Sequence, residues 1–156
     1  TLFDTDIQTG GYVAPDDFNP DYYTGGGTRL YDTIVERRQR LLDYMEQLKN
    51  NGTNARACLV ILSDGRDLHS TCRASDARKA IEDLISQEIT VAFIAFGQEA
   101  FGIAESIGVK KNNVKEVSND ERELRRIIDL VSKSAISASK KASTGAGGED
   151  DSFFTV

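Results

Sequence analysis

Residues 57–65 read Ala-Cys-Leu-Val-Ile-Leu-Ser-Asp-Gly, an apolar run that ends in a turn sequence. A second apolar run extends from Thr90 to Phe96 and ends in Gly97-Gln98. Apolar runs without alternation are typical of strands that are buried on both faces of a parallel sheet. The two runs therefore predict two strands of such a sheet.

Segments with helical periodicity lie before, between and after these runs. Apolar residues recur at helical spacing from Thr28 to Lys49, from Ala77 to Ile85 and from Leu124 to Val131. Ser118-Asn119-Asp120-Glu121 has the spacing of a capping box, so we expect the last helix to run from Asp120 to Ser137. Alternating strands and helices predict an α/β fold, with a doubly wound, mainly parallel sheet and helices on both faces.

Shorter elements complete the expected domain. A helix from Glu99 to Ile107 and a strand from Asn113 to Val117 fill the remaining gap. At the start, the sequence predicts a strand from Thr1 to Ile7, a Gly10-Gly11 turn and a return strand from Tyr12 to Ala14.

Composition divides the chain into residues 1–138, the expected domain, and residues 139–156, an acidic tail. The tail is too polar to bury enough surface to offset its ordering entropy, so we expect it to be flexible. It ends in an acidic run followed by Phe153, Phe154 and Val156. Two interpretations stay open: plain disorder, or a docking peptide with an aromatic anchor.

Bulk properties narrow the function classes. The 156 residues suit one compact domain, and the net charge of −6 disfavours nucleic acid, whose binders use Lys and Arg to meet phosphates. No apolar run approaches the roughly 20 residues of a membrane span. We expect Cys58 and Cys72 to be free thiols and, without an export signal in view, the location to be cytoplasmic.

Oxygen-bearing side chains stand at two helix and strand ends. Gly25-Gly26-Gly27-Thr28 precedes the first long helix, and Asp64 follows a buried strand. Both belong to the carboxyl edge of the predicted sheet, where ligands bind in such folds. Hydroxyl and carboxylate oxygens suit hard cations such as Mg²⁺ or Mn²⁺.

These motifs, in this order, resemble the von Willebrand factor A-type (vWA) family. The resemblance rests on Gly-Gly-Thr-x-Leu-Tyr-Asp at 26–32, Ile-Leu-Ser-Asp-Gly at 61–65 and Val-Ala-Phe-Ile-Ala-Phe-Gly at 91–97, and it covers the chain from about Thr1 to Ser137. It implies a Rossmann-like fold with a metal ion-dependent adhesion site (MIDAS). By this resemblance, Thr28 and Asp64 match the family's threonine and aspartate ligands, and the resemblance implies that the metal binds an acidic side chain of a partner protein.

The chain departs from this family in one respect. No Asp-x-Ser-x-Ser motif, the family's first ligand loop, occurs in these residues. By resemblance, the first strand and that loop would precede Thr1. Three explanations stay open: the chain is a fragment, another chain supplies the strand, or the sheet has rearranged. We expect the first, and we expect metal binding by these residues alone to be weak or absent.

Each site residue also has a structural interpretation. Thr28 is a common type of helix cap, and Asp64 is a common turn residue before glycine. Asp32 and Asp67 are expected to be solvated or hydrogen-bonding neighbours of the site rather than ligands. The remaining residues placed near the site are Gly26, Gly27 and Gly65.

Two alternatives to a metal-dependent binding module stay open. Leu2-Phe3-Asp4-Thr5-Asp6 superficially resembles the start of haloacid dehalogenase-type phosphotransferases, in which one Asp is the nucleophile. The other alternative is a vWA-like scaffold that binds a partner without metal. We expect a domain that is not an enzyme, and we expect His69 to be a surface residue.

Overall fold

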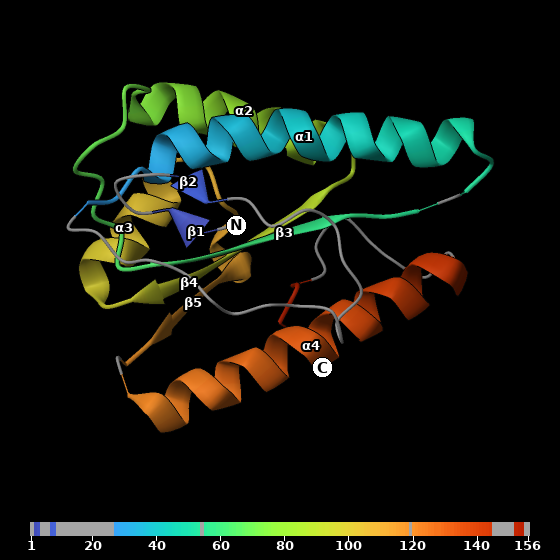
Figure 1. Cartoon of the computed structure of the whole chain (residues 1–156). Helices are drawn as coiled ribbons and strands as arrows, with labels where there is room; N and C mark the ends of the chain where they lie inside the picture. The colour runs from blue at the N-terminus through green and yellow to red at the C-terminus, as the bar shows by residue number, and fades with distance from the viewer. Residues whose placement is uncertain are drawn as a thin grey trace.

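A computed structural model describes residues 2–3, 7–8, 27–53, 55–118, 120–144 and 152–154. Figure 1 shows the order of the elements along the chain. They are β1 (Leu2–Phe3), β2 (Ile7–Gln8), α1 (Leu30–Asn50), β3 (Cys58–Ser63), α2 (Ala74–Ser86), β4 (Thr90–Phe96), α3 (Gln98–Ser106), the 3-10 helix η2 (Lys111–Asn113), β5 (Val114–Val117) and α4 (Glu121–Thr144).

The centre of the fold is a three-stranded sheet in the order β3-β4-β5, and both pairings are parallel. Cys58 lies opposite Thr90 and Ser63 opposite Ala95, so β3 and β4 run in register to their carboxyl ends. Residues 91–95 of β4 are at most 2% exposed, as expected of a strand covered on both faces. The predicted parallel strands and α/β class are confirmed.

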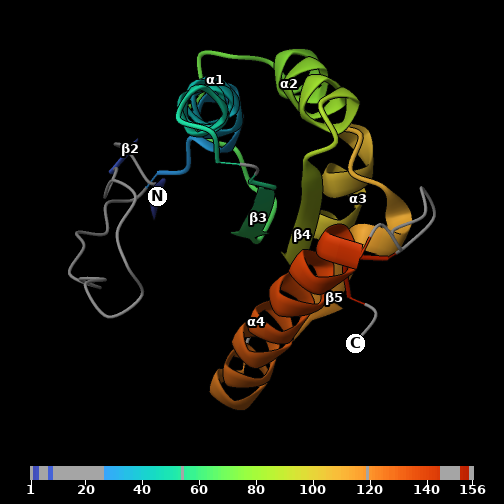
Figure 2. The same ribbon diagram turned by 90° about the vertical axis from the view of Figure 1, so that its right-hand side faces the viewer.

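Helices cover both faces of this sheet. The larger apolar cluster joins α1, α2 and α3 to one face through residues such as Ile34, Ile81 and Phe93. On the other face, Ile127 of α4 packs with Ile94 and Val117. Figures 1 and 2 show α1 and α2 on one side of the strands and α4 on the other.

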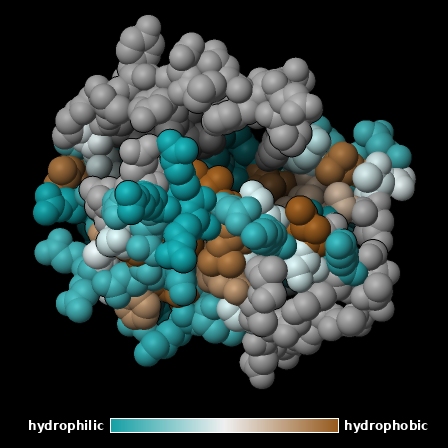
Figure 3. Space-filling view, turned by 90° about the horizontal axis from the view of Figure 1, so that it is seen from below, coloured by the Kyte–Doolittle hydropathy of each residue, from teal (hydrophilic) through white to brown (hydrophobic). Residues whose placement is uncertain are grey.

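The outer surface of α4 is mostly hydrophilic. Among the residues of α4 whose burial is described, Ile128 and Ile136 are the exposed large apolar side chains, at 54% and 56%. Figure 3 shows the molecule from the side on which α4 lies, where apolar surface borders a hydrophilic band. Within the described ranges, no helix is both long and apolar enough to cross a bilayer.

The predicted strand from Thr1 to Ile7 is wrong. β1 ends at Phe3, and Ile7–Gln8 pairs back onto it antiparallel, with Phe3 opposite Ile7. Periodicity does not predict this antiparallel pairing, because each strand is only two residues long. The return strand expected from Tyr12 to Ala14 lies outside the described residues.

Helix α4 begins as predicted but ends later. The cap differs from the expected capping box: the Asp120 carboxylate accepts the N–H of Arg122 at 2.9 Å, whereas the hydroxyl of Ser118 donates to the side chain of Glu123. The helix continues past Ser137, and past the boundary expected at residue 138, to Thr144. Large apolar residues guided the prediction, and none follows Ile136 in this helix.

Candidate functional site

The carboxyl ends of the three parallel strands meet at one edge of the sheet. Asp64 follows β3, Gly97 follows β4 and Ser118 follows β5. The register places Ser63 beside Ala95 and Phe96 beside Val117, so these following residues share the edge. Among the predicted site residues, Asp64 is exposed, whereas Gly26 lies outside the described residues.

Asp32, in the first turn of α1, accepts several hydrogen bonds from the loop that follows β3. It is 8% exposed, and its carboxylate accepts the N–H of Cys72 at 2.7 Å and that of Thr71 at 3.0 Å. The guanidinium of Arg29 donates to it at 2.6 Å and 3.0 Å. Burial alone would raise the pKa of Asp32, but these donors hold that pKa well below its usual range. Asp32 is therefore a permanently charged structural carboxylate at neutral pH.

The loop after β3 caps the N-terminus of α1. The hydroxyl of Ser70 donates to Asp67 at 2.7 Å and accepts the N–H of Asp32 at 3.0 Å, while the N–H of Tyr31 donates to Asp67 at 3.4 Å. In return, the carbonyl of Thr28 accepts the N–H groups of Leu68 and His69 at 3.0 Å each. Loop and helix start thereby satisfy each other's free backbone groups.

Thr28 is not the helix cap that its residue type suggests. The helix begins at Leu30, and Arg29, at the cap position, makes no side-chain cap bond. The capping acceptors come instead from Asp67 and Ser70, on the loop that joins β3 to α2. We call these mutual hydrogen bonds between the loop after β3 and the start of α1 the clamp. Thr28 contributes its backbone carbonyl to the clamp, and its half-buried side chain lies just before the helix.

Gly65 allows the turn that presents Asp64. Its φ is +84°, and a Cβ at this position would lie 2.5 Å from Cα of Ala100 in α3. Its N–H donates to the hydroxyl of Ser63 at 3.0 Å, and the next N–H, of Arg66, donates to Asp64 at 3.2 Å. No residue with a side chain fits this position without displacing α3.

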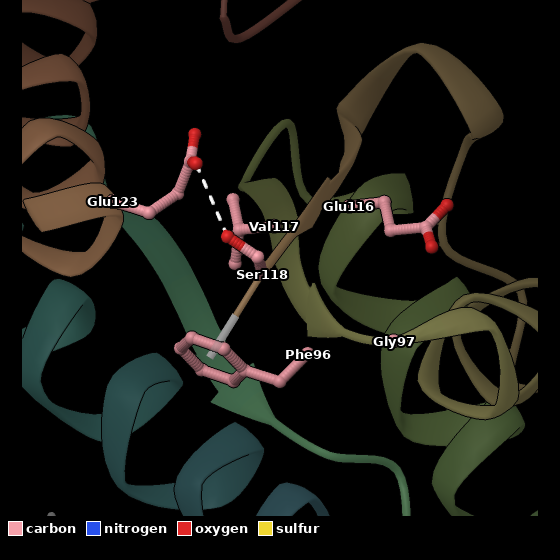
Figure 4. A pocket seen from close by; sticks show the side chains of 6 residues that line it. All are labelled: Phe96, Gly97, Glu116, Val117, Ser118 and Glu123. Atoms are coloured by element: carbon pink, nitrogen blue, oxygen red, sulfur yellow. Dashed lines mark hydrogen bonds between the residues drawn. The ribbon is translucent and has the colours of Figure 1, made fainter. Parts of the chain in front are cut away.

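A pocket of about 510 Å³ opens farther along the same edge (Figure 4). It is lined by Phe96, Gly97, Glu116, Val117, Ser118 and Glu123. The hydroxyl of Ser118 donates to Glu123 at 3.2 Å, while Glu116 lies apart from this pair. None of these residues was predicted to belong to a site, although Gly97 and Ser118 directly follow predicted strands.

Few side chains at this edge could act as ligands for a cation. Among the described residues, no three His, Cys, Asp or Glu side chains gather closely enough to hold a metal ion. Asp32 and Asp67 are already engaged in holding the loop. The exposed carboxylate of Asp64 and the hydroxyl of Thr28 remain as candidate ligands, and they fit a hard cation only as part of a larger oxygen set.

The chain matches no protein-family model, and neither curated proteins nor solved structures give a significant match. The resemblance to the vWA family thus rests on the motifs around Thr28, Asp64 and Gly97. Asp4 and Asp6, which suggested a phosphotransferase, lie outside the described residues. The strand before Asp4 belongs to the antiparallel β1-β2 pair and not to the parallel sheet.

The cysteines and His69 can also be compared with their predictions. Cys58 and Cys72 are both free and half-buried, as predicted. Burial raises the pKa of the Cys58 thiol to about 12, and the pKa of Cys72 is raised by the hydrogen bond from its thiol to Asp32, together with burial. His69 is exposed and uses its backbone N–H to hold Thr28.

Proposed function

We propose that this chain is a protein-binding domain, without catalytic activity, that meets its partner at the carboxyl edge of its sheet. A divalent cation such as Mg²⁺ or Mn²⁺, held by Asp64 and Thr28, bridges to an acidic side chain of the partner. The observation that supports this is that three neighbouring carboxylates differ in their contacts. Asp32 and Asp67 fix the loop, while Asp64 stands exposed at the end of a buried strand.

The geometry favours binding over catalysis at this edge. The clamp from Asp32 and Asp67 holds the Asp64 loop to α1, and Gly65 fixes its turn against α3. A preorganised carboxylate loses little conformational entropy when it binds a cation. The remaining oxygen ligands would come from water, from the partner, or from residues outside the described ranges.

We also propose that the sheet extends beyond β3 in the working domain. β3 pairs only with β4 among the described strands, although its sequence is apolar on both faces. Leu62 is 39% exposed, unlike the residues of β4. A further strand along this edge would produce the doubly wound arrangement and bring its own loop to Asp64.

Calorimetry with Mg²⁺ and Mn²⁺ tests the metal part of this proposal. We expect the wild-type chain to bind weakly and Asp64→Asn to bind about tenfold more weakly or not at all. Asp43→Asn, which changes an exposed carboxylate on α1, is the matched control and should bind as the wild type does. Equal binding by wild type and Asp64→Asn would contradict the assignment.

A further inference from the structure

The end of the chain is docked on its own domain. The hydroxyl of Ser152 donates to the carbonyl of Asn112 at 2.6 Å, and the N–H of Phe153 donates to Oδ1 of Asn113 at 2.7 Å. Phe153 is only 5% exposed. Two consecutive residues are thus fixed on η2, far from them in the sequence.

Aromatic packing adds to these hydrogen bonds. Phe154 packs against the cluster of Ile94, Val117 and Ile127, which joins β4, β5 and α4. The ring centroids of Phe153 and Phe154 lie 5.1 Å apart and the ring planes meet at 79°, which is an edge-to-face arrangement that aromatic pairs prefer. Asn113, whose side-chain oxygen accepts the N–H of Phe153, is itself 7% exposed in this docked arrangement.

Charge complements this contact. The sequence brings Glu149, Asp150 and Asp151 directly up to Ser152. Ser152 is anchored at Asn112, which follows the exposed residues Lys110 and Lys111. Opposite charges that approach at a surface increase association rates and orient the encounter.

We propose that Asn112, Asn113 and the cluster beside them form a recognition surface for a peptide in which acidic residues precede Ser-Phe-Phe. We call it the tail-binding surface. In the isolated chain the surface is filled by residues 152–154 of the same molecule, and a partner protein with the same acidic and aromatic sequence displaces them. This function is independent of the metal proposed at Asp64.

The tether explains how such a site stays closed. Only residues 145–151 separate the end of α4 from Ser152, and a short tether gives an effective concentration of about 1 mM. A peptide at micromolar concentration competes poorly against it. Removing the two aromatic anchors from the tail should open the surface without changing the surface itself.

Fluorescence anisotropy with a labelled peptide of residues 147–156 tests this inference on the full-length chain. We expect Phe153→Ala/Phe154→Ala to bind the peptide at least about tenfold more tightly than the wild type. Adding Asn113→Ala to this variant should abolish binding, and a peptide with alanine at both phenylalanine positions should not bind. Lys111→Ala should weaken binding, whereas Lys79→Ala, on α2, should not.

Three results would overturn the proposal. The first is equal affinity of the wild type and the double variant, and the second is no binding by a double variant whose circular dichroism matches the wild type. The third is a wild-type dimer that Phe153→Ala converts to monomer, because the tail would then dock on a second copy. Hydrogen exchange on the wild type provides a test without substitution: the Phe153 amide should be protected, and exchange at its intrinsic rate would contradict self-docking.

Discussion

The backbone N–H of Cys72 donates to Oδ1 of Asp32 at 2.7 Å, joining two residues that are 40 positions apart. This bond closes a clamp in which the loop after β3 caps α1 and α1 holds the loop. The same loop begins with Asp64 and Gly65 at the sheet edge. The loop that presents Asp64 is therefore held in place by the buried carboxylate of Asp32 on α1.

Replacing this carboxylate should destabilise the domain. Asp32→Ala leaves the N–H groups of Thr71 and Cys72 and the Arg29 guanidinium without their acceptor, so we expect the free energy of unfolding to fall by about 2–4 kcal/mol. Urea denaturation measures this change. Asp43→Ala on the same helix is exposed and should change it by less than about 0.5 kcal/mol; similar losses in both variants would contradict the clamp.

The contribution of Asp32 should also depend on pH. Its pKa is lower in the folded state than in the unfolded chain, so its stabilising effect is complete above the unfolded value and is lost as the pH falls. The stability difference between wild type and Asp32→Asn should be constant above about pH 5 and shrink below about pH 4. Urea midpoints measured between pH 7 and 2 test this, and a difference that grows on acidification would be the wrong sign.

The sequence alone predicts the elements well where many residues carry the same signal. The runs at 57–62 and 90–96 are long enough to define β3 and β4, and periodicity finds α1 and α2. The clamp could not be predicted, because its bonds run between side chains and backbone groups some 40 residues apart, such as Asp32 and Thr71. That Phe153 docks on its own domain could not be predicted for a related reason: the tail sequence left disorder and a docking peptide open, and the partner Asn113 is distant in sequence.

In the candidate site, too, the locally encoded features could be predicted and the contacts between distant residues could not. Asp64 could be recognised because a carboxylate after a buried strand is a local pattern. Its dependence on Gly65 could be predicted only in part, since the turn suggests a glycine but the approach of Ala100 comes from α3. The role of Thr28 was assigned to its hydroxyl, whereas the contacts found are made by its carbonyl.

Thiol reactivity should report the link between Asp32 and Cys72. The hydrogen bond to the carboxylate raises the pKa of Cys72 and so lowers its thiolate fraction at neutral pH. We expect Asp32→Asn to accelerate alkylation of Cys72 by iodoacetamide at pH 8, because the higher thiolate fraction outweighs the lower nucleophilicity of the thiolate. Cys58, whose pKa is raised by burial alone, is the internal control; equal acceleration at both thiols would indicate general unfolding instead.

Removing an unsatisfied hydroxyl should stabilise α4. Oγ of Ser134 is buried and has no hydrogen-bond partner among the described residues. Ser134→Ala removes this polar atom and favours the helix, so we expect a gain of about 1 kcal/mol in the free energy of unfolding. Ser132→Ala, at an exposed position two residues earlier, is the comparison and should change stability by less than about 0.5 kcal/mol. A loss of stability in Ser134→Ala would show that this hydroxyl is bonded after all.

A series of three glycines should separate backbone strain from close approach. Gly65→Ala combines a positive φ with a Cβ only 2.5 Å from Cα of Ala100, and we expect it to cost about 3 kcal/mol of stability. Gly97→Ala has open space around its Cβ, but its φ of +94° and ψ of 167° are adopted almost only by glycine, so it should cost about 2 kcal/mol from backbone strain alone. Gly102→Ala, within α3 and with nothing near its Cβ, should instead stabilise the domain by about 0.5–1 kcal/mol. Thermal unfolding of the three variants gives the order directly. If Gly65→Ala cost no more than Gly97→Ala, the contact of the Asp64 turn with α3 would not constrain the site.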